Sequence, residues 1–156
     1  MSYLTQKTIK KNVSFSGVAL HSGLDVNICI KPAEPNFGIV FKRVDLSNNN
    51  LVYPNFLNVT NTSLNTTIEN EFGVKVVTIE HLMGALFGLG IDNALVEIDN
   101  EEVPILDGSA KEYIQKIQLT GLKVSEAPIK IIKINNKIEY SDGKRYIAIQ
   151  PSTLSL

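Results

Sequence analysis

Apolar residues in this sequence follow two different periods, and this contrast constrains the fold more than any other feature. Residues 26–30 alternate between apolar and polar side chains, as a half-buried strand does, and Pro32 ends the run. Residues 79–86 instead place apolar side chains three and four positions apart, which is typical of a helix. Alternation returns at residues 94–98, and helical spacing returns at residues 113–117. The sequence therefore predicts an α+β unit.

Two hairpins are also predicted. Residues 66–68 and 74–77 flank a turn, and residues 137–140 and 146–150 flank another, with a strand at 129–134 before the second hairpin. Residues 147–152 repeat the pattern of residues 28–33, which fits either an internal repeat or a chance match. If the repeat is real, residues 1–127 form a complete first domain. Residues 128–156 are then the first β-hairpin of a truncated second domain.

Composition narrows the class of protein. A chain of 156 residues is expected to form one domain of ordinary size, about 100–200 residues. Its 15 basic and 16 acidic residues give a net charge of −1, which argues against electrostatic binding of nucleic acid. Cys29 is the single cysteine and cannot form an internal disulfide. We find no apolar run of about 20 residues and no secretory signal, so we expect a cytoplasmic protein without a transmembrane segment.

Few side chains in the sequence can perform catalysis or bind a metal. His21, His81 and Cys29 are the only nitrogen and sulfur ligands available, and Cys29 alternates along a strand as a small core residue would. Glu80 and His81 stand together where a helix begins, after Thr78 as the expected N-cap. A purely structural role explains both, because an acidic residue complements the helix dipole and a histidine fits the first turn. That structural role is the more common explanation, and the alternative is a functional role, with His81 as a neutral metal ligand and Glu80 as a proton acceptor.

A second polar region surrounds His21 in a loop bounded by Gly17 and Gly23. A surface histidine is the usual explanation for such a residue. Leu20, an apolar residue at the tip of the same loop, could line an apolar groove. A turn at residues 107–108, followed by a capping box from Ser109, predicts the start of the second helix.

Four motifs in this order resemble the bacterial zinc-dependent UDP-3-O-acyl-N-acetylglucosamine deacetylases, the LpxC family, along nearly the whole chain. They are Gly-Val-Ala-Leu-His-Ser-Gly at 17–23, Thr-Ile-Glu-His-Leu at 78–82, Gly-Leu-Gly-Ile-Asp-Asn at 88–93 and Val-Pro-Ile-Leu-Asp-Gly-Ser at 103–109. The resemblance implies two similar α+β domains with the active site between them. Each domain would be a mixed or antiparallel sheet backed by two helices, a ribosomal protein S5 domain 2-like fold.

The resemblance also assigns roles to particular residues. His81 is implied as a Zn²⁺ ligand, and Glu80 as the general base that activates the zinc-bound water. The water attacks the acetamide of the substrate, UDP-3-O-acyl-N-acetylglucosamine, and releases acetate in an early cytoplasmic step of lipid A synthesis in Gram-negative bacteria. Substrate-binding positions near the acyl chain and the rim of the zinc site are implied for Leu20, Ser63, Leu64 and Asn65.

One part of the family pattern does not occur in this sequence. The family takes its other two zinc ligands from a His-Lys-x-x-Asp motif in the second domain, which also carries a general-acid histidine, and neither occurs in residues 1–156. We therefore expect a fragment or one piece of a split enzyme, inactive alone, with the missing C-terminal half as a possible separate partner chain. The alternative is a non-catalytic remnant or binding domain of the same family.

Overall fold

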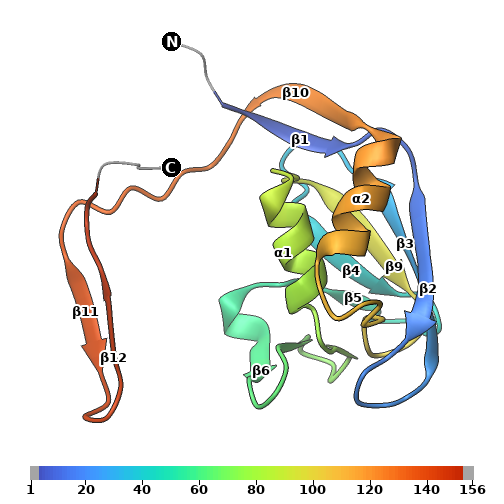
Figure 1. Ribbon diagram of the computed structural model, residues 1–156, viewed down its shortest axis with the longest axis horizontal. Helices are drawn as coiled ribbons and strands as arrows, with labels where there is room; N and C mark the ends of the chain where they lie inside the picture. The colour runs from blue at the N-terminus through green and yellow to red at the C-terminus, as the bar shows by residue number, and fades with distance from the viewer. Residues whose placement is uncertain (1–3, 153–156) are drawn as a thin grey trace.

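The computed structural model describes residues 4–152, and its centre is a five-stranded mixed sheet (Figure 1). The strand order is β2, β3, β9, β4, β5. In that order the strands span Val13–Val18, Asp25–Pro32, Ala94–Ile98, Ile39–Arg43 and Leu51–Val52. β4 and β9 run parallel, whereas the other neighbouring pairs are antiparallel.

The predicted strand at residues 26–30 is confirmed within β3, and its alternation decides which side of the sheet is buried. Val26, Ile28 and Ile30 are at most 1% exposed, so they face the core. Cys29 points to the other side of the same strand and is half-buried, so the expectation that it is a core residue is wrong. The alternation of a strand sends neighbouring side chains to opposite faces, and here only one face is covered by helices.

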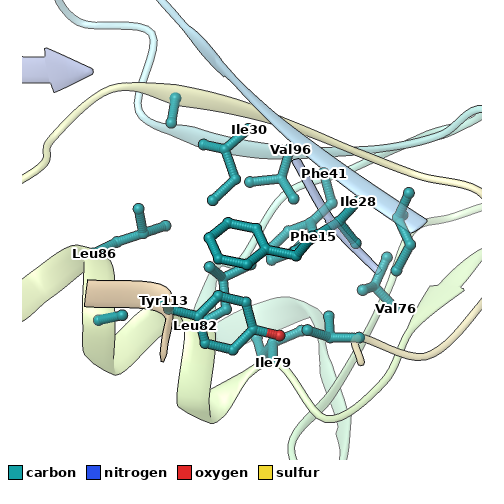
Figure 2. Packing of buried hydrophobic residues seen from close by; sticks show 14 of the residues in the cluster. Phe15, Ile28, Ile30, Phe41, Val76, Ile79, Leu82, Leu86, Val96 and Tyr113 are labelled. Atoms are coloured by element: carbon teal, nitrogen blue, oxygen red, sulfur yellow. The ribbon is translucent and has the colours of Figure 1, made fainter. Parts of the chain in front are cut away.

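Two helices, α1 (Glu80–Gly88) and α2 (Lys111–Thr120), lie together over the sheet (Figure 1). Leu82 and Leu86 of α1 and Tyr113 of α2 point into the core between helices and sheet (Figure 2). The ring of Tyr113 lies 4.9 Å from that of Phe15 on β2, which ties α2 to the sheet edge. The predicted α+β class is confirmed, with two helices backing the sheet.

Both predicted helix caps are wrong in detail. Ile79, not Thr78, precedes the first residue of α1, and it makes no side-chain capping bond. The Thr78 hydroxyl instead donates to the carboxylate of Glu102, 24 residues further along the chain. At α2 the residue before the helix is Ala110. The Ser109 hydroxyl accepts from the backbone N–H of Lys111 instead of forming a capping box.

Smaller sheets complete the chain. β1 (Thr5–Ile9) pairs with β10 (Leu122–Pro128), and β6 (Val59–Asn61), β7 (Thr67–Glu69) and β8 (Lys75–Val76) form a three-stranded sheet after the 3₁₀ turn Phe56–Asn58. The hairpin predicted around residues 70–73 is confirmed as β7–β8.

The second predicted hairpin also forms, from β11 (Ile138–Ser141) and β12 (Tyr146–Ile149), and it lies apart from the main body (Figure 1). The strand predicted at 129–134 is wrong, because this apolar run belongs to no strand, although the N–H of Ile129 donates to the carbonyl of Leu4 at 3.0 Å. The strand that does occur here is β10, which was not predicted. The division into domains 1–127 and 128–156 stays a prediction, and its outer ends, residues 1–3 and 153–156, lie outside the described residues.

Candidate active site at the start of the first helix

Glu80 and His81 lie side by side in the first turn of α1, as the sequence predicted, and both are half-buried. Oε2 of Glu80 accepts a hydrogen bond of 3.1 Å from the backbone N–H of Thr66. The Thr66 carbonyl in turn accepts from the N–H of Ile79 at 3.4 Å. Two hydrogen bonds therefore join Thr66 to the start of α1, one accepted by the Glu80 carboxylate and one donated by the neighbouring Ile79. Together they fix the orientation of the Glu80 side chain.

The loop before Thr66 carries three of the implied substrate-binding residues. Leu64 is 90% exposed and has a backbone φ of 65°, a left-handed conformation that costs a leucine free energy. Ser63 is exposed, with its N–H donating to Asn61, while the side-chain oxygen of Asn65 accepts from the Thr67 hydroxyl. The structure thus connects this loop to Glu80 through Thr66.

Leu20 lies in a separate loop that backbone hydrogen bonds close. The N–H of Ala19 donates to the carbonyl of Leu24 at 2.9 Å, and that of Gly23 donates to Ala19 at 3.1 Å. Leu20 remains 56% exposed at the tip of this loop, and His21 follows it. An exposed leucine in a closed loop is available to an apolar ligand.

Glu102 links the His21 loop to the start of α1, and sequence reasoning missed it. The residue is 3% exposed, and its carboxylate accepts from the N–H groups of His21 and Ser22 and from the hydroxyl of Thr78. Burial alone would raise the pKa of Glu102, but these hydrogen bonds outweigh it and hold the pKa below the ordinary glutamate value. The only signal in the sequence is an acidic residue directly before the apolar run at 103–106.

Two neighbouring cavities lie beside the connection that Glu102 makes between the His21 loop and the start of α1. One of about 410 Å³ is lined by His21, Val77 and Glu101 among others. Another of about 380 Å³ shares Val77 and Glu101 and extends to Asn65 and β7. A third cavity, of about 430 Å³, lies elsewhere, between residues 49–58 and the turn at 70–72. None of these three is lined by Glu80 or His81.

The metal-binding capacity of the site is limited to His81 and its neighbours. Over residues 4–152, no group of three or more histidine, cysteine, aspartate or glutamate side chains is arranged to hold a metal ion. His21 and His81 belong to different segments, and Cys29 lies on the uncovered face of the sheet. A carboxylate held by a backbone N–H beside a half-buried imidazole is nevertheless a pair suited to proton transfer and to metal ligation.

Comparisons with known proteins agree with this reading of the motifs. The chain matches the family UDP-3-O-acyl N-acetylglycosamine deacetylase (LpxC) over residues 6–156. It is 44% identical over 148 residues to a UDP-3-O-acyl-N-acetylglucosamine deacetylase of Teredinibacter turnerae, covering 95% of this chain and 48% of that relative. Proteins with the same name from Pseudoalteromonas atlantica and Shewanella frigidimarina are 43% identical over 148 residues and 42% identical over 146 residues. Those matches cover 95% and 94% of this chain, and 49% and 48% of the relatives.

The chain belongs to the LpxC family of deacetylases, which confirms the resemblance drawn from the four motifs. It spans about half the length of the curated relatives it matches. Within the part of the chain that the structure describes, neither helix is long and apolar enough to cross a membrane.

Proposed function

We propose that this chain supplies the first-domain half of a deacetylase active site that hydrolyses the acetamide of UDP-3-O-acyl-N-acetylglucosamine. The family match over residues 6–156, together with Glu80 and His81 in one helical turn, supports this function. The reaction would take place in the cytoplasm as an early step of lipid A synthesis in Gram-negative bacteria. The relatives' names state the substrate and the reaction, and the chain's own residues supply the chemistry.

Glu80 is the general base of the proposed reaction. Its Oε2 is occupied by the Thr66 N–H, while Oε1 accepts no hydrogen bond from any described residue and is free to take a proton. A water molecule attacks the acetamide carbon, and its proton passes to Oε1. The carbon–nitrogen bond then breaks, the leaving nitrogen takes the proton held at Oε1, and the acetic acid that forms ionises to acetate. A positioned carboxylate typically contributes about 10²–10⁴-fold to such a step.

Zinc is the implied cofactor, and the described residues do not form a complete site for it. A catalytic zinc centre takes three protein ligands, whereas this chain offers His81 with no further grouped ligands between residues 4 and 152. When bound, zinc supplies a Lewis acid that polarises the substrate carbonyl. His81 would hold the metal from one side, and the remaining ligands would come from the C-terminal half that the relatives possess and this chain does not span.

Exposed apolar residues suit the acyl chain of the substrate. Leu20 is 56% exposed and Leu64 is 90% exposed, and each projects from a loop joined to the start of α1. Burying one leucine side chain against a hydrocarbon chain contributes about 1.5–3 kcal/mol. Ser63 and Asn65 would then form the polar rim beside Glu80.

The domain organisation is part of the same proposal. Residues 1–127 would be the first of two similar ribosomal protein S5 domain 2-like domains, and the hairpin within 128–156 would begin the second. Support comes from the hairpin itself, whose Ile138, Tyr140, Ile147 and Ile149 side chains are all more than half exposed. Such a hairpin is marginal alone in water and is stabilised by further strands or helices.

The test is to complete the 156-residue chain with the C-terminal half of the Teredinibacter turnerae relative and to measure acetate release with zinc present. We expect activity in the completed enzyme and a loss of about 10²–10⁴-fold in Glu80→Gln. Glu126→Gln removes the same charge from an exposed position on β10 and should retain activity. His81→Ala should lose both activity and bound zinc, measured by elemental analysis.

Unchanged acetate release in Glu80→Gln would overturn the assignment of the base. Calorimetry on the 156-residue chain alone distinguishes the alternative function. Tight binding of the UDP-sugar by that chain, with no turnover after completion, would favour the non-catalytic binding domain over the enzyme.

A further inference from the structure

The buried Glu102 carboxylate joins the two segments that carry the candidate site residues. Its Oε1 lies 3.0 Å from the N–H nitrogen of His21 and 2.9 Å from the hydroxyl oxygen of Thr78. Its Oε2 lies 2.9 Å from the N–H nitrogen of Ser22 and 3.2 Å from that of His21. One ionised side chain therefore accepts hydrogen bonds from the loop after β2 and from the residue two positions before Glu80. Hydrogen bonds to an ionised acceptor are about twice as strong as neutral ones.

Thr78 shows why this connection matters at the start of α1. Its φ is 58°, a left-handed value that is rare for a β-branched residue and costs about 1–3 kcal/mol unless the surroundings impose it. Thr78 is 2% exposed, and its hydroxyl bond to Glu102 is one of the contacts that impose the conformation. Because the chain direction at Thr78 sets where Ile79 and Glu80 enter the helix, Glu102 fixes the approach to the site.

Backbone hydrogen bonds on both sides of Glu102 hold this segment in place, and they thereby fix the position of the Glu102 carboxylate. The N–H of Val77 donates to the carbonyl of Glu101 at 2.9 Å, and the N–H of Val103 donates to the carbonyl of Val77 at 3.0 Å. Two residues further on, the N–H of Ile105 donates to the carbonyl of Val18, which ends β2. The segment from Glu101 to Ile105 thus runs between the His21 loop and the strand that leads into α1.

We propose that Glu102 is a positioning residue of the deacetylase, which holds the loop at residues 20–22 and the first turn of α1 in the relative placement that the reaction requires. This proposal rests on the proposed function, since it concerns the same site. Glu102 would not contact the reacting atoms, because its carboxylate is buried and both oxygens are occupied. Its effect would pass through Thr78 to Glu80 and through the loop backbone to Leu20.

The first test uses Glu102→Gln, which keeps the shape of the side chain but replaces one acceptor oxygen with an NH₂ donor. In the 156-residue chain we expect amide hydrogen exchange at His21 and Ser22 to accelerate about tenfold or more, because at least one N–H loses its charged acceptor. Glu101→Gln is the matched control, since its exposed side chain carries the same charge one residue away. Unchanged exchange in Glu102→Gln would overturn the proposed link.

The second test measures kinetics in the chain completed with the relative's C-terminal half. We expect kcat to fall about 10–100-fold in Glu102→Gln with zinc content retained, because small misplacements of a catalytic group are costly. Thr78→Val should lower kcat in the same direction while preserving shape, and Thr78→Ser, which keeps the hydroxyl, should restore it. If Thr78→Val and Thr78→Ser behave alike, the positioning role is wrong.

The two tests separate this proposal from the function on which it rests. If the completed wild-type enzyme releases no acetate, the proposed function fails, and the hydrogen-exchange result still decides whether Glu102 holds the loop. If Glu80→Gln abolishes activity and Glu102→Gln leaves kcat unchanged, the function stands and the positioning role is refuted.

Discussion

The hydrogen bond of the Tyr113 hydroxyl holds the segment before α2 against the core, and removing this hydroxyl measures its contribution to stability. Tyr113 is fully buried, and its hydroxyl donates a hydrogen bond to the carbonyl of Pro104. Replacing it with phenylalanine leaves the ring contact with Phe15, 4.9 Å between centroids, but removes the donor. The carbonyl then stays buried without this partner.

The loss of this one hydrogen bond sets the expected loss of stability in Tyr113→Phe. An unpaired buried acceptor costs about 1–3 kcal/mol, and the more apolar phenylalanine ring offsets part of this. We therefore expect Tyr113→Phe to lower the free energy of unfolding by about 1–2 kcal/mol. For a chain of this length that corresponds to a melting temperature lower by about 2–8 °C.

Urea unfolding followed by far-UV circular dichroism measures this effect. Tyr53→Phe serves as the control, because Tyr53 is 51% exposed and its hydroxyl should contribute less than about 0.5 kcal/mol. If Tyr113→Phe stays within about 0.5 kcal/mol of the wild type at an unchanged m value, the argument is refuted. The Pro104 carbonyl would then not depend on this hydroxyl.

Three further predictions concern the same chain. Burial, with the Glu112 carboxylate nearby, raises the pKa of Tyr113 above its ordinary value, so the folded state keeps a proton that the unfolded chain loses above about pH 10. Stability should therefore fall as pH rises beyond about 10. In urea titrations at about pH 9 and about pH 11, the advantage of wild type over Tyr113→Phe should shrink, and a constant difference would contradict this. Leu82→Ala should cost about 2–5 kcal/mol by leaving a cavity under α1, whereas Phe87→Ala, 88% exposed on the same helix, should cost less than about 0.5 kcal/mol in the same urea assay. Leu64→Gly should raise stability by about 1 kcal/mol, because glycine adopts φ of 65° freely and the exposed leucine loses little packing. A thermal melt shifted downwards would show that Leu64 is not strained.

The alternating and helical patterns predicted the strands and helices correctly wherever the local pattern alone decides which face of the element is buried. Residues 26–30 and 94–98 form strands with one buried face, and Leu82 and Leu86 point into the core as their spacing predicted. Burial of one face fixes these elements almost independently of their neighbours. The pair Glu80 and His81 could be located for the same reason, because the helix start is a local feature.

The predictions were wrong where a partner far away in the sequence decides whether a segment forms a strand or which group a side chain bonds. β10 is a strand because it pairs with β1 near the other end of the chain, whereas residues 129–134 are more apolar but form no strand. Threonine is a residue type that commonly caps helices, yet the hydroxyl of Thr78 donates to the carboxylate of Glu102 instead. A sequence pattern shows what a residue can bond to, but not which group the fold brings to it.

The sequence by itself determined the α+β class, the LpxC family and the position of the candidate pair Glu80 and His81 at the start of a helix. These depend on local periodicity and on residue types in a fixed order. Only the tertiary structure decided that Thr66 orients Glu80 and that Glu102 ties the His21 loop to Thr78. A buried carboxylate must be satisfied by donors from wherever the chain passes, and the packing of segments far apart in sequence selects those donors.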